Sequence, residues 1–309
     1  PALTRGALNV LRLVGDEYVK STYIAPIVAG TWGGTMCLTE PSAGSDVGSL
    51  KTTAKPIDGK EGWFKIKGTK IFISSGDSDL YENNIHLVLA RTPEGKPGPK
   101  GISLFVVPKH RVNADGTVGD KNDVRCSGIE HKMGIHASAT CVMNFGDEDN
   151  CEGYLIGDEF DGMTNMFIMM NQARLDVGVQ GESQANLAFE LTKQYVQERT
   201  QFKTELENLP DVKRMMLRMR AMSRGLRSLM LYTSNLFDLA EKDKKYNDYI
   251  GLLVPICKSF GSDEGFKVAV EAVQCHGGYG FCTEYGIEQF VRDTKIASLY
   301  EGTNGIQAI

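Results

Sequence analysis

The spacing of hydrophobic residues along this 309-residue chain changes its period twice. Residues 1–32 carry apolar side chains at spacings near three and four, which indicate helix, and Pro26 and Gly30 are expected to end it. Residues 33–153 form short alternating or apolar runs between Gly, Pro, Asn and Asp clusters, which predict β-strands. From about Gly157 the helical period returns in three or four long stretches.

These patterns predict an α+β fold in three parts. They are a helical segment (1–32), a central β sandwich or barrel (33–153), and an α-helical bundle (154–309). Helices, then strands, then helices exclude the alternating order of a doubly wound sheet. The absence of G-x-G-x-x-G and of a Walker motif also argues against a Rossmann or P-loop nucleotide site.

Composition narrows the classes of partner. With 34 basic and 39 acidic residues, the net charge is −5 and no block of like charges predicts a nucleic-acid partner. No apolar run predicts a membrane span, the first residues do not resemble a signal peptide, and seven cysteines without a C-x-x-C pair are expected to be reduced. These features predict a cytoplasmic protein. His131 and His136 lack the spacing of metal ligands, so we expect no metal site.

The densest chemical signal is the segment M-C-L-T-E-P-S-A-G-S-D at residues 36–46. Here a strand pattern enters a loop of small and hydroxyl residues, whose backbone N–H groups and side chains can contact a flat polar ligand or a phosphate. An ordinary Pro-Ser-Gly-Asp turn would give the same local sequence and is the commoner explanation. The segment by itself leaves both interpretations open.

T-E-P-S-A-G-S-D at residues 39–46 resembles the signature of the acyl-CoA dehydrogenases, and further segments resemble that family in the same order. They are K-I-F-I-S (70–74), K-M-G-I-H-A-S (132–138), E-R-T-Q-F (198–202), Q-C-H-G-G-Y-G (274–280) and Y-E-G-T (300–303). His136 stands where relatives commonly have Arg, which leaves the role of this position open. The resemblance is greatest to the methylthiopropanoyl-CoA dehydrogenase and long-chain-like branch, and it implies that the chain is an internal fragment. Residues 1–32 would then be the end of an N-terminal helical domain, and the α-helical bundle (154–309) would be incomplete.

The resemblance implies FAD as the cofactor. It places Thr39 and the Leu38 backbone against the flavin, Ser45 near the pyrophosphate, and Arg199 on the FAD of a neighbouring subunit, where a guanidinium suits a diphosphate. The implied cofactor-binding residues are Met36, Leu38, Thr39, Ser45, Phe72, Ile73, Ser74, Arg199, Gln201, Phe202, Gln274, Gly277, Gly278 and Thr303. Without the resemblance, these segments would be read as a strand, a solvated helix face and a helix cap.

Glu301 is the catalytic base that the resemblance implies. It would take a proton from carbon 2 of an acyl-CoA thioester while a hydride passes from carbon 3 to the flavin, giving a trans-2-enoyl-CoA. Apolar neighbours are expected to raise the pKa of Glu301 toward neutrality. The implied substrate-binding residues are Ser45, Arg174, Tyr300 and Gly302, and Glu182 or Asp176 is the next candidate base.

The resemblance also implies an electron-transfer flavoprotein as the electron acceptor and a homodimer or homotetramer as the assembly. An acyl-CoA oxidase that passes electrons to oxygen is an alternative with the same chemistry. A non-dehydrogenating, FAD-containing DNA-binding relative is an alternative of another class. The acidic balance and the retained Y-E-G at residues 300–302 argue against DNA binding, and the acyl chain is left open.

Overall fold

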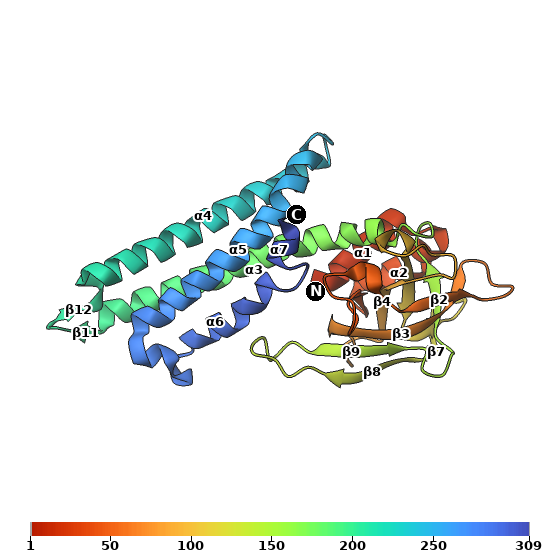
Figure 1. The fold of residues 1–309 in the computed structure, drawn as a ribbon, viewed down its shortest axis with the longest axis horizontal. Helices are drawn as coiled ribbons and strands as arrows, with labels where there is room; N and C mark the ends of the chain where they lie inside the picture. The colour runs from red at the N-terminus through yellow and green to blue at the C-terminus, as the bar shows by residue number, and fades with distance from the viewer. Residues whose placement is uncertain (1, 309) are drawn as a thin grey trace. The chain divides into compact units, whose positions relative to one another are not determined.

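The structure, a computed structural model, describes residues 2–308 and divides them into two compact units. The first unit holds residues up to His131 together with His136–Gln172, and the second holds Lys132–Ile135 together with residues from Ala173 onward. The predicted α+β order of helices, sheet and helical bundle is confirmed (Figure 1). The predicted domain boundaries at residues 32 and 153 stay predictions.

The first unit begins with two helices, α1 (Ala2–Val14) and α2 (Glu17–Ala29), where the sequence predicted one helical stretch. The Asp16 carboxylate caps the start of α2, because it accepts a backbone N–H of the first turn. Gly30, with φ 79°, ends α2 as predicted. The expectation that Pro26 also ends the helix is wrong: Pro26 lies inside the last turn, where its missing N–H removes a single helical bond.

The centre of the first unit is an eight-stranded sheet with the strand order β1-β4-β5-β10-β3-β9-β8 and with β2 paired to β3. β1 and β4 run parallel, whereas the other pairs in this sheet are antiparallel. The strands are β1 (Trp32–Cys37), β2 (Thr53–Pro56), β3 (Trp63–Ser74), β4 (Asn83–Ala90), β5 (Ser103–Pro108), β8 (Val124–Ile129), β9 (Thr140–Phe145) and β10 (Glu152–Leu155). β6 (His110–Val112) and β7 (Val118–Lys121) form a separate hairpin.

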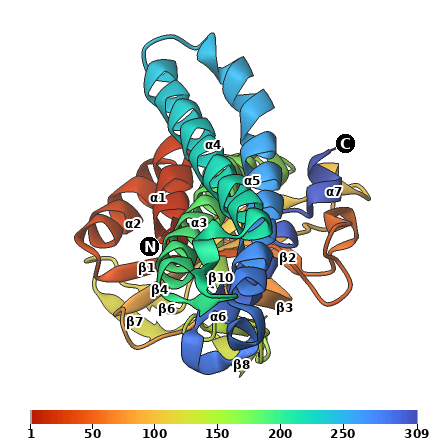
Figure 2. The same ribbon diagram turned by 90° about the vertical axis from the view of Figure 1, so that its left-hand side faces the viewer.

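Two hydrophobic cores cover the two faces of this sheet. Every residue of β4 is buried, because Leu87 and Leu89 enter the core shared with α1 and α2 while Val88 and Ala90 enter the core on the other face. A strand covered on both faces reads as a nearly continuous apolar run, as the L-V-L-A end of β4 does. α1 and α2 lie close to β1 in Figure 2, and both helices contact that strand.

The second unit is a bundle of long helices. α4 (Pro210–Ala240) and α5 (Tyr246–His276) run side by side in both views (Figures 1 and 2), and the shorter α6 (Ile287–Thr294) packs on α5. α3 (Gly162–Glu198) contributes its residues from Ala173 onward, and the unit ends in the short α7 (Asn304–Gln307). None of the helices within residues 2–308 combines the length and the apolar composition that crossing a bilayer requires.

Glycines allow α3 and α5 to touch through their backbones. A Cβ on Gly261 of α5 would lie 2.8 Å from the Cα of Gly178 on α3, and one on Gly265 would lie 2.6 Å from the carbonyl oxygen of Gly181. Because backbone atoms cannot rotate away as a side chain can, only glycine permits this approach. The spacing of α3 and α5 is therefore set by the absence of side chains at these positions.

Gly261→Ala is expected to lower the free energy of unfolding by about 1–3 kcal/mol, because the added methyl group forces the two helices apart. Gly225→Ala on α4 is the matched control, since a Cβ at Gly225 meets no atom within 4 Å. That change should stabilise the protein by roughly 0.5–1 kcal/mol through helix propensity. Urea unfolding of both variants measures the difference, and equal effects would contradict the close contact.

Candidate functional site

A buried carboxylate organises the loop that follows β1 in the first unit. Glu40 accepts hydrogen bonds from the backbone N–H groups of Lys51 (2.6 Å) and Thr52 (3.0 Å) and from the Thr52 hydroxyl (2.6 Å). It also forms an ion pair at 2.8 Å with the ammonium group of Lys70, and the side chains of Glu40 and Lys70 are 4% and 0% exposed. Glu40 therefore fastens the loop both to the following segment and to β3.

Lys70 joins the same loop to β3 by a second route. Its ammonium group donates to the carbonyl of Leu38 at 3.2 Å, and the N–H of the next residue, Ile71, donates to the carbonyl of Thr39 at 2.9 Å. Burial disfavours the charged form of Glu40. The charge and hydrogen bond of Lys70, together with the hydrogen bonds from Thr52 and Lys51, nevertheless hold the pKa of Glu40 below its ordinary value. Burial lowers the pKa of Lys70, and Glu40 opposes that shift.

A bulge in β3 exposes the aromatic ring of Phe72. The pairing of β3 with β9 shifts register between Lys70 and Ile73, and Phe72 adopts a left-handed φ of 61°. Its side chain is 60% exposed, whereas Ile73 is buried in the core beneath it. A left-handed bulky residue is strained, and such strain concentrates at ligand sites. The Ile71–Thr39 hydrogen bond ties this bulge directly to the loop after β1.

The groups gathered here suit a flat heterocycle attached to a phosphate. The hydroxyls of Thr39, Ser45 and Ser74 have no hydrogen-bond partner among residues 2–308, and Ser45 is exposed. Met36 is partly buried and Leu38 is buried. An exposed aromatic ring, unpartnered hydroxyls and a loop backbone can together bind a flat, partly polar ligand.

A strained hairpin in the second unit carries the next group of predicted residues. β11 (Thr200–Gln201) and β12 (Thr204–Glu205) are joined by Phe202 and Lys203, which have φ values of 53° and 60°. Such a turn usually contains Asn-Gly, because two left-handed residues are needed. Phe202 is instead 87% exposed at the tip. An apolar ring in a strained, exposed turn favours a contact with another surface.

A pocket of about 460 Å³ lies beside this hairpin. Its walls include five of the predicted FAD residues, namely Arg199, Gln201, Gln274, Gly277 and Gly278. The guanidinium of Arg199 lies 5.3 Å from the ring centre of Tyr279, another wall residue. The fold therefore brings the hairpin and the C-terminal turn of α5 together around one concave surface, although they are more than seventy residues apart in the chain.

Glu301 lies in a left-handed turn, and side chains from α3 and α7 donate hydrogen bonds to its backbone carbonyl. Glu301 has φ 55° and Gly302 has φ 83°. The carbonyl of Glu301 accepts from the Arg174 side chain at 3.3 Å and from the Gln307 amide at 3.1 Å. The Thr303 hydroxyl caps α7. The structure therefore places Arg174, Gly302 and Thr303 around Glu301, and their assignment to substrate or cofactor stays a prediction.

The electrostatic surroundings of Glu301 suit a proton acceptor. Its Oε2 atom is buried without a hydrogen-bond partner within the described part of the chain. Burial raises the pKa of Glu301 to about 7, and the positive charges of Arg174 and Lys258 oppose the shift. The neighbouring Tyr300 donates its hydroxyl to Gln180 on α3, and burial raises the pKa of that hydroxyl. A carboxyl group with a pKa near neutrality exchanges protons readily at physiological pH.

The alternative base Glu182 has a different environment. Its carboxylate forms an ion pair at 2.9 Å with Arg227 of α4, so a counter-charge already occupies it. Sequence reasoning missed Lys258, Gln180 and Asn304, which hold the turn around Glu301. Lys258 could have been noticed in the sequence, because it is a single charged residue inside a long apolar stretch of α5. Histidine, cysteine and carboxylate side chains do not gather in groups of three or more anywhere within residues 2–308.

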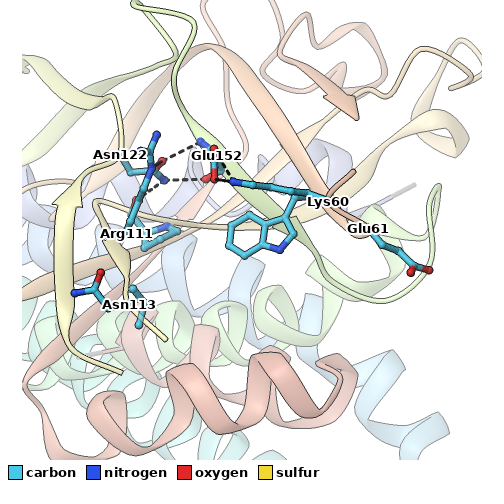
Figure 3. A pocket seen from close by; sticks show the side chains of 9 residues that line it. Lys60, Glu61, Arg111, Asn113, Asn122 and Glu152 are labelled. Carbon is cyan, nitrogen blue, oxygen red and sulfur yellow. Dashed lines mark hydrogen bonds and ion pairs between the residues drawn. The ribbon is translucent and has the colours of Figure 1, made fainter. Parts of the chain in front are cut away.

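Another pocket, of about 540 Å³, lies on the first unit away from the loop after β1. Figure 3 shows Lys60 reaching Glu152, with which it forms an ion pair at 3.1 Å, and Arg111 beside Asn122. Asn122 also exchanges hydrogen bonds with the backbone of Glu152. These polar groups satisfy one another, so we assign no ligand to this pocket.

Lys70→Met is expected to lower the free energy of unfolding by about 3–5 kcal/mol, because it leaves the Glu40 carboxylate buried without its counter-charge. Lys67→Met is the matched control on the same strand, since Lys67 is 59% exposed and pairs with the exposed Asp149. That change should leave the stability nearly unaltered. Chemical unfolding followed by circular dichroism measures both, and a stable Lys70→Met variant would contradict the structural role.

Two family descriptions match the chain. "Acyl-CoA dehydrogenase, middle domain" matches residues 35–147, and "Acyl-CoA dehydrogenase, C-terminal domain" matches residues 161–309. The first match covers most of the β sheet, and the second covers the helical bundle. Members of this family are FAD-dependent flavoproteins.

Known proteins resemble the chain over nearly all of its length. The 3-methylmercaptopropionyl-CoA dehydrogenase of Ruegeria pomeroyi is 43% identical over 322 aligned positions that cover 100% of the chain and 54% of that protein. An acyl-CoA dehydrogenase of Bacillus subtilis is 32% identical and is covered to 73%, over 97% of the chain. The structure of butyryl-CoA dehydrogenase from Megasphaera elsdenii has a TM-score of 0.82 at 27% identity, over 99% of the chain and 74% of that structure.

The chain spans about half the length of the first of these curated relatives and almost three quarters of the second. The motifs of the sequence, the sheet followed by a helical bundle, and both family matches agree with one another. The chain belongs to the acyl-CoA dehydrogenase family.

Proposed function

We propose that the protein is an FAD-dependent enzyme that converts an acyl-CoA thioester to its trans-2-enoyl-CoA. The observation that carries this proposal is Glu301, whose buried carboxyl group has an unpartnered Oε2 atom and a pKa of about 7. A carboxyl group of this kind is suited to general-base catalysis at neutral pH. It stands in the Y-E-G-T segment at residues 300–303 by which the chain resembles its family.

FAD is held, in this proposal, by two groups of residues. The exposed Phe72 ring and the unpartnered hydroxyls of the loop after β1 suit its flavin, and the walls of the 460 Å³ pocket suit the FAD of a neighbouring subunit. The proposed contacts are Met36, Leu38, Thr39, Ser45, Phe72, Ile73, Ser74, Arg199, Gln201, Phe202, Gln274, Gly277, Gly278 and Thr303. When bound, FAD supplies the acceptor for the electron pair that leaves carbon 3 of the substrate.

Glu301 takes the proton from carbon 2 onto its carboxylate. The negative charge that develops is delocalised onto the thioester oxygen and needs a hydrogen-bond donor. The backbone N–H of Glu301 has no acceptor among residues 2–308, so it is free to donate to that oxygen. We assign the remaining contacts to the substrate to Ser45, Arg174, Tyr300 and Gly302.

We further propose a homodimer or homotetramer that passes its electrons to an electron-transfer flavoprotein. The exposed Phe202 at the hairpin tip supports an assembly, since it presents an apolar ring for another subunit.

Relatives named for 3-methylmercaptopropionyl-CoA and butyryl-CoA make short acyl thioesters the first substrates to test. Oxygen as the acceptor is the competing outcome, and peroxide formation during turnover would establish it.

Glu301→Gln is the experiment that tests the proposed base. The amide keeps the size of the side chain but cannot accept the proton, so flavin reduction is expected to slow by at least about 10²–10⁴-fold. The measurement is anaerobic single-turnover bleaching of the flavin by butyryl-CoA or 3-methylmercaptopropionyl-CoA in the full-length protein. FAD content should equal that of the parent. A yellow variant that reduces at the parent's rate would show that Glu301 is not the base.

The pH dependence of flavin reduction should follow the ionisation of Glu301. Because the carboxylate is the active form, the single-turnover rate should rise with pH through about 7 and level off above it. Stability should show the opposite trend, since a pKa raised from 4.5 to about 7 means that folding favours the protonated form. Glu301→Gln should therefore raise the melting temperature more at pH 8 than at pH 5. Equal effects at the two pH values would contradict the raised pKa.

A further inference from the structure

A fully buried lysine lies beneath the turn that carries Glu301. Lys258 of α5 is 0% exposed, and its ammonium group donates to the carbonyl of Gly302 at 2.7 Å and to the Oδ1 atom of Asn304 at 2.8 Å. Both acceptors are neutral, and no carboxylate of the described residues forms an ion pair with Lys258. A buried charge without a direct counter-charge is costly, so its presence calls for a functional explanation.

Asn304 extends this contact into a network on α5. Its amide nitrogen donates to the Ser262 hydroxyl at 2.9 Å and to the Asp263 carboxylate at 2.8 Å. These two acceptors determine the orientation of the amide, because they leave Oδ1 to face the ammonium group of Lys258. The turn is thereby anchored to α5 at Gly302 and at Asn304, directly after Glu301.

Helix α3 anchors the same turn from its other side. Arg174 donates to the carbonyl of Glu301 itself, at 3.3 Å. The left-handed conformation of Glu301 is unfavourable for a residue with a side chain, whereas that of Gly302 is ordinary for glycine. Fixed donors at the carbonyls of both residues help to keep Glu301 in this conformation. Lys258 supplies the donor for Gly302, and a neutral apolar side chain at that position would leave a buried carbonyl unsatisfied.

The charged and titratable groups around Glu301 come from each neighbouring element. Arg174 faces it from α3, Lys258 from α5, and Tyr300 precedes it in the turn, while Asp263 of α5 lies beyond Asn304. The ammonium group of Lys258 and the guanidinium of Arg174 favour the ionised carboxyl, against the burial that disfavours it. In return, Glu301 opposes the burial that lowers the pKa of Lys258 to about 8.

We propose that Lys258 is a positioning residue that holds the Glu301 turn in its left-handed conformation, with its positive charge placed to favour the carboxylate form of Glu301. The inference rests on the proposed role of Glu301 as the base. Lys258 acts through the backbone of Gly302 and through its charge, and it takes no proton from the substrate. Its contribution is to make the carboxylate available before the thioester binds.

The test compares Lys258→Met, which removes both the charge and the hydrogen bonds, with Lys258→Gln, which keeps a donor. Lys267→Met is the control, because Lys267 lies on the same helix, is 54% exposed and pairs with Glu264. In the FAD-loaded full-length protein, the pH midpoint of single-turnover flavin reduction should rise by about one unit in both Lys258 variants, which means an about tenfold slower reaction below the midpoint. Lys267→Met should keep the parent's profile.

Infrared difference spectroscopy measures the same titration without turnover, with the band of Glu301 identified by its loss in Glu301→Gln. An unshifted Glu301 titration in both folded Lys258 variants would overturn the proposal. If Glu301→Gln reduces its flavin at the parent's rate, the proposed base is wrong, and the infrared titration still decides whether Lys258 controls the ionisation of Glu301.

Asn304→Ala covers the case in which both Lys258 variants fail to fold. It keeps the ammonium group and removes one anchor of the turn. The rate of flavin reduction should then fall at every pH, while the midpoint should not rise because the charge of Lys258 is still present. A parent-like rate in Asn304→Ala would overturn the positioning role.

Discussion

The backbone contact between α3 and α5 is the constraint on which the surroundings of Glu301 depend. Where Gly181 and Gly261 meet, the two helices approach more closely than any side chain would permit. α3 brings Arg174 to the turn after α6, and α5 brings Lys258 to the same turn from the other side. A wider spacing would withdraw one of these donors from its carbonyl. The glycines are thus part of the site, although they contact no ligand themselves.

Each unit uses a buried lysine to fix a loop, and the two lysines differ in whether their ammonium group bonds a carboxylate directly. Lys70 contacts the carboxylate of Glu40 directly, which keeps that group ionised and unavailable as a base. Lys258 instead donates to neutral oxygens and acts on Glu301 through space. Burial raises the pKa of Glu301 to about 7 and the charges of Arg174 and Lys258 only oppose this shift, so Glu301 remains able to accept a proton.

Strained backbone marks the three places that we assign to cofactor and substrate. Phe72, Phe202 and Glu301 all have left-handed φ values, in a bulge, a hairpin turn and a helix-flanking turn respectively. Phe72 and Phe202 expose apolar rings, which would be unfavourable in water without a partner. Each conformation persists because neighbouring hydrogen bonds determine it, as the Ile71–Thr39 bond does beside Phe72. These features could not be read from the residue types, since none of the three is a glycine.

The sequence by itself determined the order of helices, sheet and bundle, because the spacing of apolar residues directly reflects which face of each element is buried. It also identified Glu301 and the loop after β1, since their residue types recur in a recognisable order. Only the tertiary structure decided that Lys258 donates to the Gly302 carbonyl, that Glu182 forms an ion pair with Arg227, and that residues 2–29 form two helices. The two side-chain contacts join positions more than forty residues apart, and the helix break depends on one capping carboxylate. A local pattern reports periodicity and composition, but a contact between distant residues exists only once the chain has folded.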